Sequence, residues 1–180
     1  MTDLRKKFRS GETFAEFLAR PKKFPEFWEG VYKRATVPED ILSRALMLTS
    51  QWHFLVLSED WCGDSINTLP LIARLVDQAP MIDMRIIGRD ANSDVMDDHL
   101  TNGGRSIPVI ILLDSDFVER GWWGPRPAQL QRWVVDTGLA LSKEERYRQV
   151  RTWYARDHGR AVLTELLEMI ERNAQNPMEV

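Results

Sequence analysis

The chain has 180 residues, of which 43% are hydrophobic and 28% charged, and its formal net charge is −3 at pH 7. This composition is typical of a globular protein and excludes an intrinsically disordered chain, while the length suits one domain with a sizeable core. The slightly acidic balance predicts no general affinity for nucleic acid or for an acidic membrane surface.

The chain contains a single cysteine, Cys62, so no intramolecular disulfide can form. Such cysteine usage is typical of a reducing compartment. Basic residues in positions 1–10 are not followed by an apolar stretch, and the longest apolar runs, such as Val109–Leu113, are too short to span a bilayer. We therefore expect a cytoplasmic protein that does not bind membranes.

The first third of the chain predicts helices. Thr13–Arg20 carries apolar residues at helical spacing, and Phe27–Arg34 predicts a second short helix. A third begins near Pro38, because a proline followed by two acidic residues is typical of a helix start. Its apolar side chains, expected to face a core, are Ile41, Leu42, Ala45, Leu46 and Leu48.

Beyond residue 50 the pattern changes to short apolar strands separated by amphipathic helices. The expected strands are His53–Leu57, Met81–Ile87, Val109–Leu113 and Phe117–Trp122. The expected helices are Asp64–Gln78, Asp94–Leu100 and Pro127–Thr137. The alternating part predicts parallel strands joined by crossover helices, and the closing hairpin predicts an antiparallel edge. We expect an α/β fold with a mixed four-stranded sheet flanked by helices.

A long charged segment, Lys143–Asn173, predicts a helical extension interrupted at Gly159. Its basic first half is interpreted as a solvated face, with a partner-binding face as the alternative. The chain is thus expected to form a single domain, residues 1–180. Residues 1–50 make a helical N-terminal extension, 51–140 the core, and 141–180 a helical C-terminal extension.

Cys62 lies where a predicted strand runs directly into a predicted helix. The unpaired N–H groups and the positive dipole end of a helix N-terminus stabilise a thiolate, so this position predicts a lowered pKa and a nucleophilic sulfur. Gly63 is expected to let the backbone turn tightly beside the sulfur, and Trp61 to offer an apolar platform to a substrate peptide.

Three segments resemble thioredoxin sequences. The Trp-Cys-Gly-Asp-Ser run at 61–65 resembles the Trp-Cys-Gly-Pro-Cys signature, and Arg105–Val109 resembles the cis-proline loop. The likeness is closest to a bacterial branch that carries Trp-Cys-Gly-Asp-Cys, Thr-Asn-Gly-Gly-Arg-Ser-Ile-Pro and Trp-Gly-Pro-Arg-Pro; the last two correspond to 101–108 and 123–127. The resemblance is strong over residues 50–140 and weaker over the helical flanks. It implies a thioredoxin fold, with Pro108 in cis facing Cys62 and the backbone of Ile107 pairing with substrate.

Ser65 stands where the family has its second, resolving cysteine. A dithiol site resolves its own mixed disulfide, whereas here an external thiol such as glutathione must do so. The Ser65 hydroxyl either donates a hydrogen bond to the thiolate, which would keep it ionised, or is a simple first-turn polar residue.

Two further positions depart from the family. Asp64 replaces the usual proline, and its charge opposes a neighbouring thiolate, although we expect the helix N-terminus to outweigh it. Val56 stands where thioredoxins bury an aspartate, which fits a site with no second sulfur to deprotonate. Glu59 and Asp60 are interpreted as exposed loop carboxylates.

These features support a monothiol thiol–disulfide exchange protein with Cys62 and Ser65 as catalytic residues. The expected substrate-binding residues are Trp61, Gly63, Asp64, Ile107 and Pro108. Expected partners are protein or small-molecule thiols and disulfides. We expect no cofactor, and no metal site because the three histidines are scattered.

Two alternatives remain open. One is a redox-inactive binding module that keeps the peptide groove of the fold, which the replacements at Ser65 and Val56 would suit. The other is an iron–sulfur or glutathione protein, because Cys-Gly-Asp-Ser is similar to the Cys-Gly-Phe-Ser of monothiol glutaredoxins. The preceding Trp61 and the lack of a glutathione-binding pattern disfavour the second alternative.

Overall fold

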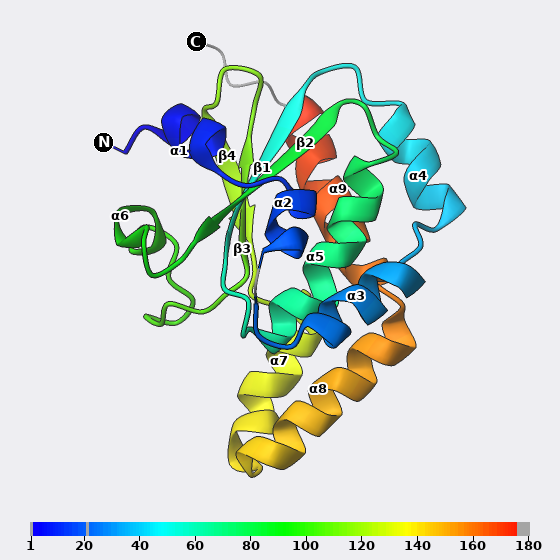
Figure 1. The fold of residues 1–180 in the computed structure, drawn as a ribbon. Coiled ribbons are helices and arrows are strands. Elements are labelled where there is room, and N and C mark those ends of the chain that lie inside the picture. Colours follow the sequence, from blue (N-terminus) through cyan, green and yellow to red (C-terminus); the bar gives the residue numbers. More distant parts are fainter. Residues whose placement is uncertain (1, 21, 176–180) are drawn as a thin grey trace.

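A four-stranded sheet forms the centre of the computed structural model, which describes residues 2–20 and 22–175 (Figure 1). The strands are β1 (Trp52–Ser58), β2 (Ile82–Gly88), β3 (Val109–Leu113) and β4 (Glu119–Trp123), in the order β2-β1-β3-β4. The expected mixed sheet with flanking helices is confirmed. Met1, Pro21 and 176–180, which belong to the two expected extensions, lie outside the described residues.

The direction of β3 differs from the expectation. β1 pairs in parallel with β2 but antiparallel with β3, and β3 pairs antiparallel with β4. The expectation of a parallel third strand was wrong. Leu57 pairs with both Ile87 and Val109, so the connection that contains α6 (Ser93–Met96) starts β3 at the end of the sheet where β2 finishes. The 14-residue α5 (Gly63–Val76) makes the crossover from β1 to the parallel β2.

Helices cover both faces of the sheet. Figure 1 shows α1 and α6 on one face, and α2 to α5 with α9 on the other, while α7 and α8 extend past one end of the sheet. The remaining helices are α1 (Leu4–Ser10), α2 (Phe14–Ala19), α3 (Pro25–Arg34), α4 (Glu39–Leu46), α7 (Ala128–Asp136), the 3-10 turn η1 (Gly138–Ala140), α8 (Lys143–Asp157) and α9 (Arg160–Gln175). The sequence analysis missed α1 and η1. In the described part of the chain, no helix combines the length and the apolar character needed to cross a membrane.

Local signals explain several helix boundaries. Thr13 and Glu16 form a reciprocal capping box at the start of α2. The predicted break at Gly159 is confirmed: α8 ends at Asp157, its C-cap His158 has φ 53°, and Gly159 has φ 80°. A Cβ at Gly159 would lie 2.3 Å from Leu71 Cδ1, so the chain passes directly over α5 here.

The two central strands, β1 and β3, are buried on both faces. Along β1, Phe54 and Val56 contact one apolar cluster, and Leu55 and Leu57 contact the other. The same alternation sends Trp123 and Trp122 to opposite faces of β4, as predicted.

The apolar face of α4 is narrower than predicted. Ile41 and Ala45 are fully buried, whereas Leu46 is 56% exposed. One residue is about 100° around a helix, so Leu46 turns away from the face that Ile41 and Ala45 share. The expectation that Leu46 enters the core was wrong.

Candidate active site

Cys62 lies at the N-cap of α5, just beyond the end of β1. The register Leu57↔Val109 sets the start of β3 beside the end of β1, which brings the loop before β3 against the sulfur. The Cys62 Sγ donates a hydrogen bond to the Ile107 carbonyl oxygen at 3.3 Å. The Ile107–Pro108 bond is cis, as the resemblance implied.

The pKa of Cys62 is raised, not lowered. The residue is 7% exposed, so burial removes water from the sulfur, and the Asp64 carboxylate repels a thiolate in addition. The Ser65 hydroxyl and the backbone N–H groups of Asp64 and Ser65 act in the opposite direction. The expectation that the helix N-terminus would lower the pKa of Cys62 was wrong, because apolar neighbours enclose the sulfur and burial raises its pKa. Cys62 is therefore a protonated thiol at neutral pH.

Ser65 contributes to the site with its hydroxyl. It is fully buried and accepts a hydrogen bond from Ser58 Oγ at 2.9 Å. Its hydrogen bond to the Cys62 sulfur lowers the pKa of the thiol, which favours the first of the two interpretations from sequence. Val56 is buried in the cluster on the opposite face of the sheet and supplies no proton acceptor.

The Asp64 carboxylate is the centre of a buried polar network. Arg126 donates to it twice, with Nε–Oδ1 at 2.9 Å and Nη2–Oδ2 at 2.6 Å, and Tyr154 Oη donates at 3.1 Å. Arg126 also donates to Gln131 Oε1 at 3.0 Å. Burial raises the pKa of Asp64, and the charge of Arg126 opposes this rise. Burial and the Asp64 charge together hold the pKa of Tyr154 well above its usual value.

The segment 123–127 carries Arg126 into the site. Gly124 has φ 137°, and a Cβ there would lie 2.1 Å from the Pro108 carbonyl oxygen, so this position requires glycine. The Gly124–Pro125 bond is also cis, which the sequence analysis did not predict. The turn at 123–127 thus packs directly on the loop that contacts Cys62.

Sequence reasoning missed Arg126 and Tyr154. Arg126 falls inside a segment that matched the family pattern, so that match was an available signal. Tyr154 lies 90 residues from Asp64 in a charged helix, and no local pattern connects the two.

Trp61, the residue before Cys62 in the sequence, is 40% exposed. The guanidinium of Arg89 lies 5.0 Å from the centre of the Trp61 ring. The loop before Cys62 is held by Trp28, whose Nε1 donates a hydrogen bond to the Asp60 carbonyl oxygen at 2.9 Å. The proposed role of Gly63 in a tight turn was wrong: it begins α5, and a Cβ there would meet nothing within 4 Å.

The loop carboxylates are more enclosed than expected. Glu59 and Asp60 are both half-buried. The Glu59 carboxylate accepts a hydrogen bond from the Asp90 N–H at 3.0 Å, and the Asp60 carboxylate accepts one from the Lys23 N–H at 2.9 Å. They hold the active-site loop to its neighbours. Within residues 2–20 and 22–175, no group of three or more His, Cys, Asp or Glu side chains is arranged to hold a metal ion.

A family model described as Thioredoxin matches residues 11–148. A Pseudomonas aeruginosa protein of unknown function superposes with a TM-score of 0.74 at 22% identity, covering 95% of this chain and 98% of that one. An HIV epitope-scaffold superposes with a TM-score of 0.75 at 20% identity, covering 94% and 98%. These two likenesses concern the fold alone. None of the curated proteins compared matches this chain.

Proposed function

The chain belongs to the thioredoxin family, and from this premise we propose that it exchanges disulfides through a single cysteine, Cys62. The observation that carries the proposal is the contact between the Cys62 Sγ and the Ile107 carbonyl at 3.3 Å, at the start of α5. This contact supports a site in which the Cys62 sulfur faces the loop whose backbone would pair with a substrate chain.

The proposed reaction is one exchange step. The Cys62 thiol loses its proton to solvent, and the thiolate attacks one sulfur of a partner disulfide. The new bond joins Cys62 to that sulfur, the old disulfide bond breaks, and the second partner sulfur leaves as a thiolate that takes up a proton. The thiolate of a small external thiol such as glutathione then attacks the partner sulfur of the mixed disulfide, so that the bond to Cys62 breaks and Cys62 takes up a proton. The partner leaves joined to glutathione by a disulfide, which a second glutathione reduces, giving oxidised glutathione.

Docking of a substrate would activate the sulfur. At rest the hydrogen bond to Ile107 favours the protonated thiol, in addition to the effect of burial. A substrate N–H that donates to the same carbonyl would compete with the S–H. The site would therefore form its thiolate mainly when a partner occupies the loop.

The partners under this proposal are protein disulfides and small thiols, and neither nucleic acid nor a membrane. Dependence on an external thiol suits a reducing compartment, so we place the protein in the cytoplasm.

Insulin reduction with glutathione as the final reductant tests the proposed function. The wild type is expected to accelerate reduction over glutathione alone, because Cys62 attacks the insulin disulfides and glutathione resolves each adduct. Cys62→Ser is expected to give no acceleration, and Ser65→Cys to reduce insulin in a single turnover without glutathione. A wild type no faster than Cys62→Ser would overturn the proposal.

A second candidate is a binding module without covalent chemistry. The observation that favours it is the burial of Cys62, whose 7% exposure and raised pKa suit a structural thiol. Pull-downs from a lysate without added reductant, with free thiols blocked by alkylation after capture, distinguish the two functions. A binding module would capture the same proteins with Cys62→Ala as with the wild type, whereas an exchange protein would lose them.

A further inference from the structure

An apolar groove begins beside the reactive cysteine and follows α5 between α3 and α8. It has a volume of about 470 Å³. Trp61 and Gly63, the two neighbours of Cys62 in the sequence, line one end of it. Any chain bonded to Cys62 therefore leaves the sulfur next to this groove.

Aromatic side chains dominate the walls of the groove and remain accessible. Phe24 is 49% exposed, Phe27 64%, Trp61 40% and Tyr147 38%. Exposed apolar side chains that occur singly are ordinary, but four aromatic rings around one hollow are typical of an interaction site. Aromatic residues at the centre of an interface supply much of its binding free energy.

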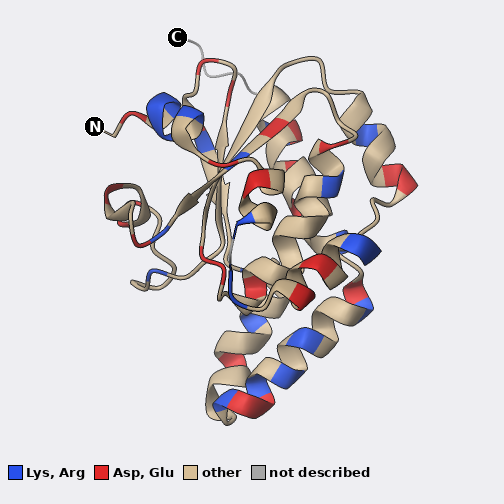
Figure 2. Ribbon diagram, viewed as in Figure 1, with Lys and Arg blue, Asp and Glu red and all other residues tan. Residues whose placement is uncertain are grey.

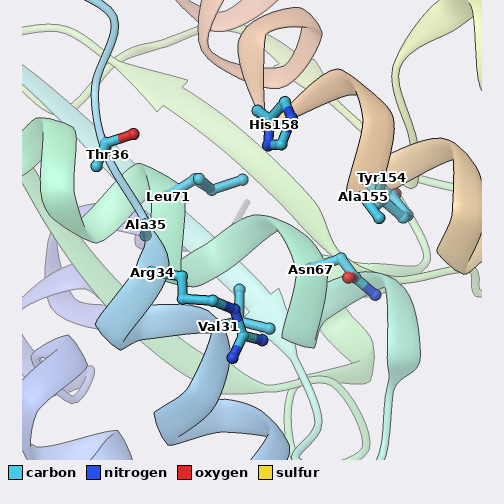
Figure 3. A pocket seen from close by; sticks show the side chains of 10 residues that line it. Val31, Arg34, Ala35, Thr36, Asn67, Leu71, Tyr154, Ala155 and His158 are labelled. Carbon is cyan, nitrogen blue, oxygen red and sulfur yellow. The ribbon is translucent and has the colours of Figure 1, made fainter.

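The groove continues into a second hollow of about 280 Å³, because Val31 and Asn67 line both. Figure 3 shows this hollow, with Arg34 on α3, Asn67 on α5 and His158 at the end of α8 around it. The two hollows thus adjoin as one channel, which is most apolar near Cys62 and carries a larger share of polar surface away from it.

The charge in this channel is unbalanced. Arg151 lines the first hollow and Arg34 the second, and neither has an ion-pair partner within residues 2–20 and 22–175. Asp64 also lines the first hollow, but its carboxylate is held by Arg126. Figure 2 shows basic positions along α8 and at the end of α3, together with acidic positions at the start of both helices. The channel therefore complements negative charge.

We propose that this channel docks a segment of the partner protein in which a large apolar side chain lies beside the exchanged cysteine and acidic residues follow it. The inference rests on the proposed function, and it adds the class of substrate. The aromatic wall holds the apolar side chain, and Arg151 and Arg34 pair with the acidic residues. The exchange chemistry itself would be the same for any disulfide.

Three peptides with one cysteine each, joined by a disulfide to thionitrobenzoate, test the proposal. The first has phenylalanine beside the cysteine and acidic residues after it, the second has alanine for the phenylalanine, and the third has lysines for the acidic residues. Attack by Cys62 on the peptide sulfur releases coloured thionitrobenzoate, and intact mass identifies the peptide adduct. The first peptide is expected to react at least about tenfold faster than the other two, the effect of about 1.4 kcal/mol at a binding hot spot.

Variants of the channel separate recognition from folding. Phe27→Ala is expected to remove the preference for phenylalanine. Arg151→Glu is expected to abolish the preference for acidic residues, because the new carboxylate offsets the remaining Arg34, and Arg34→Glu with Arg151→Glu is expected to make the lysine peptide the faster one. Met47→Ala and Arg132→Glu are matched controls, because both residues are exposed and neither lines the channel. They are expected to keep the wild-type preferences.

Two negative results have different meanings. If all three peptides react with the wild type at the same rate, the docking proposal fails while the exchange function stands. If no peptide forms an adduct with Cys62, the proposed function fails, and docking as part of exchange fails with it.

Discussion

Arg126→Met is expected to lower the free energy of unfolding by about 3–5 kcal/mol at neutral pH, the usual cost of removing one partner of a buried ion pair. Asp64 is 5% exposed and Arg126 17%, so the remaining carboxylate would stay enclosed with only the Tyr154 hydroxyl as a donor. Methionine keeps much of the volume of the arginine side chain, so the change reports on charge more than on packing. Urea unfolding of the variant and the wild type measures the difference.

The decrease in the free energy of unfolding caused by Arg126→Met is expected to depend on pH. Burial already raises the pKa of Asp64, and without Arg126 the folded-state pKa rises further. A carboxyl with a raised folded pKa stabilises the fold below its unfolded pKa, about 3.9, and this contribution is lost as the pH rises through the folded value. The difference between Arg126→Met and the wild type should therefore shrink as the pH falls from neutral toward that of a free aspartate.

The double variant Arg126→Met with Asp64→Asn is the matched control. It removes both charges, so it should be more stable at neutral pH than Arg126→Met alone. Equal losses at neutral and acidic pH would show that Asp64 is not left as an uncompensated charge, and would contradict our description of the network.

Asp64→Asn is expected to increase the reactivity of Cys62 at neutral pH. The substitution removes the carboxylate that raises the pKa of the thiol, and it leaves the positive charge of Arg126 nearby. For each unit by which the pKa falls, the thiolate fraction rises about tenfold while the nucleophilicity of each thiolate falls, for a net gain of about threefold. The rate of iodoacetamide alkylation as a function of pH gives both the pKa and the gain.

Asp60→Asn serves as the matched control for this measurement. Asp60 lies in the same loop, but its carboxylate accepts the Lys23 N–H and is not among the groups that shift the pKa of Cys62. The wild-type profile should have its midpoint above about 8.5, the value of a free cysteine. Superimposable profiles for the wild type and Asp64→Asn would contradict the role assigned to Asp64.

The position of the site could be predicted from the sequence, but its electrostatics could not. The strand before Cys62, the helix after it and the Pro108 loop are each encoded by a short run of residues, and all three are found where the sequence placed them. The pKa of the thiol depends on how many apolar side chains enclose it, and those come from distant elements such as Met96 and Val109. A rule based on the helix N-terminus alone therefore gave the wrong direction.

Long-range pairings account for the other differences. Nothing near Tyr154 in the sequence reveals that its hydroxyl reaches Asp64. Nothing in the connection 89–108 reveals that β3 starts at the end of the sheet where β2 finishes. Gly124 shows the same limit, because its need for glycine comes from the Pro108 carbonyl 2.1 Å from the position of a Cβ.

The most direct test of exchange through Cys62 is the intact mass of the native protein after incubation with oxidised glutathione at mildly alkaline pH. We predict one glutathione joined to the wild type, removed by dithiothreitol and absent from Cys62→Ser. An unmodified native protein, under conditions in which the urea-unfolded chain acquires the adduct, would show that the folded structure withholds the sulfur from disulfides and would contradict the account.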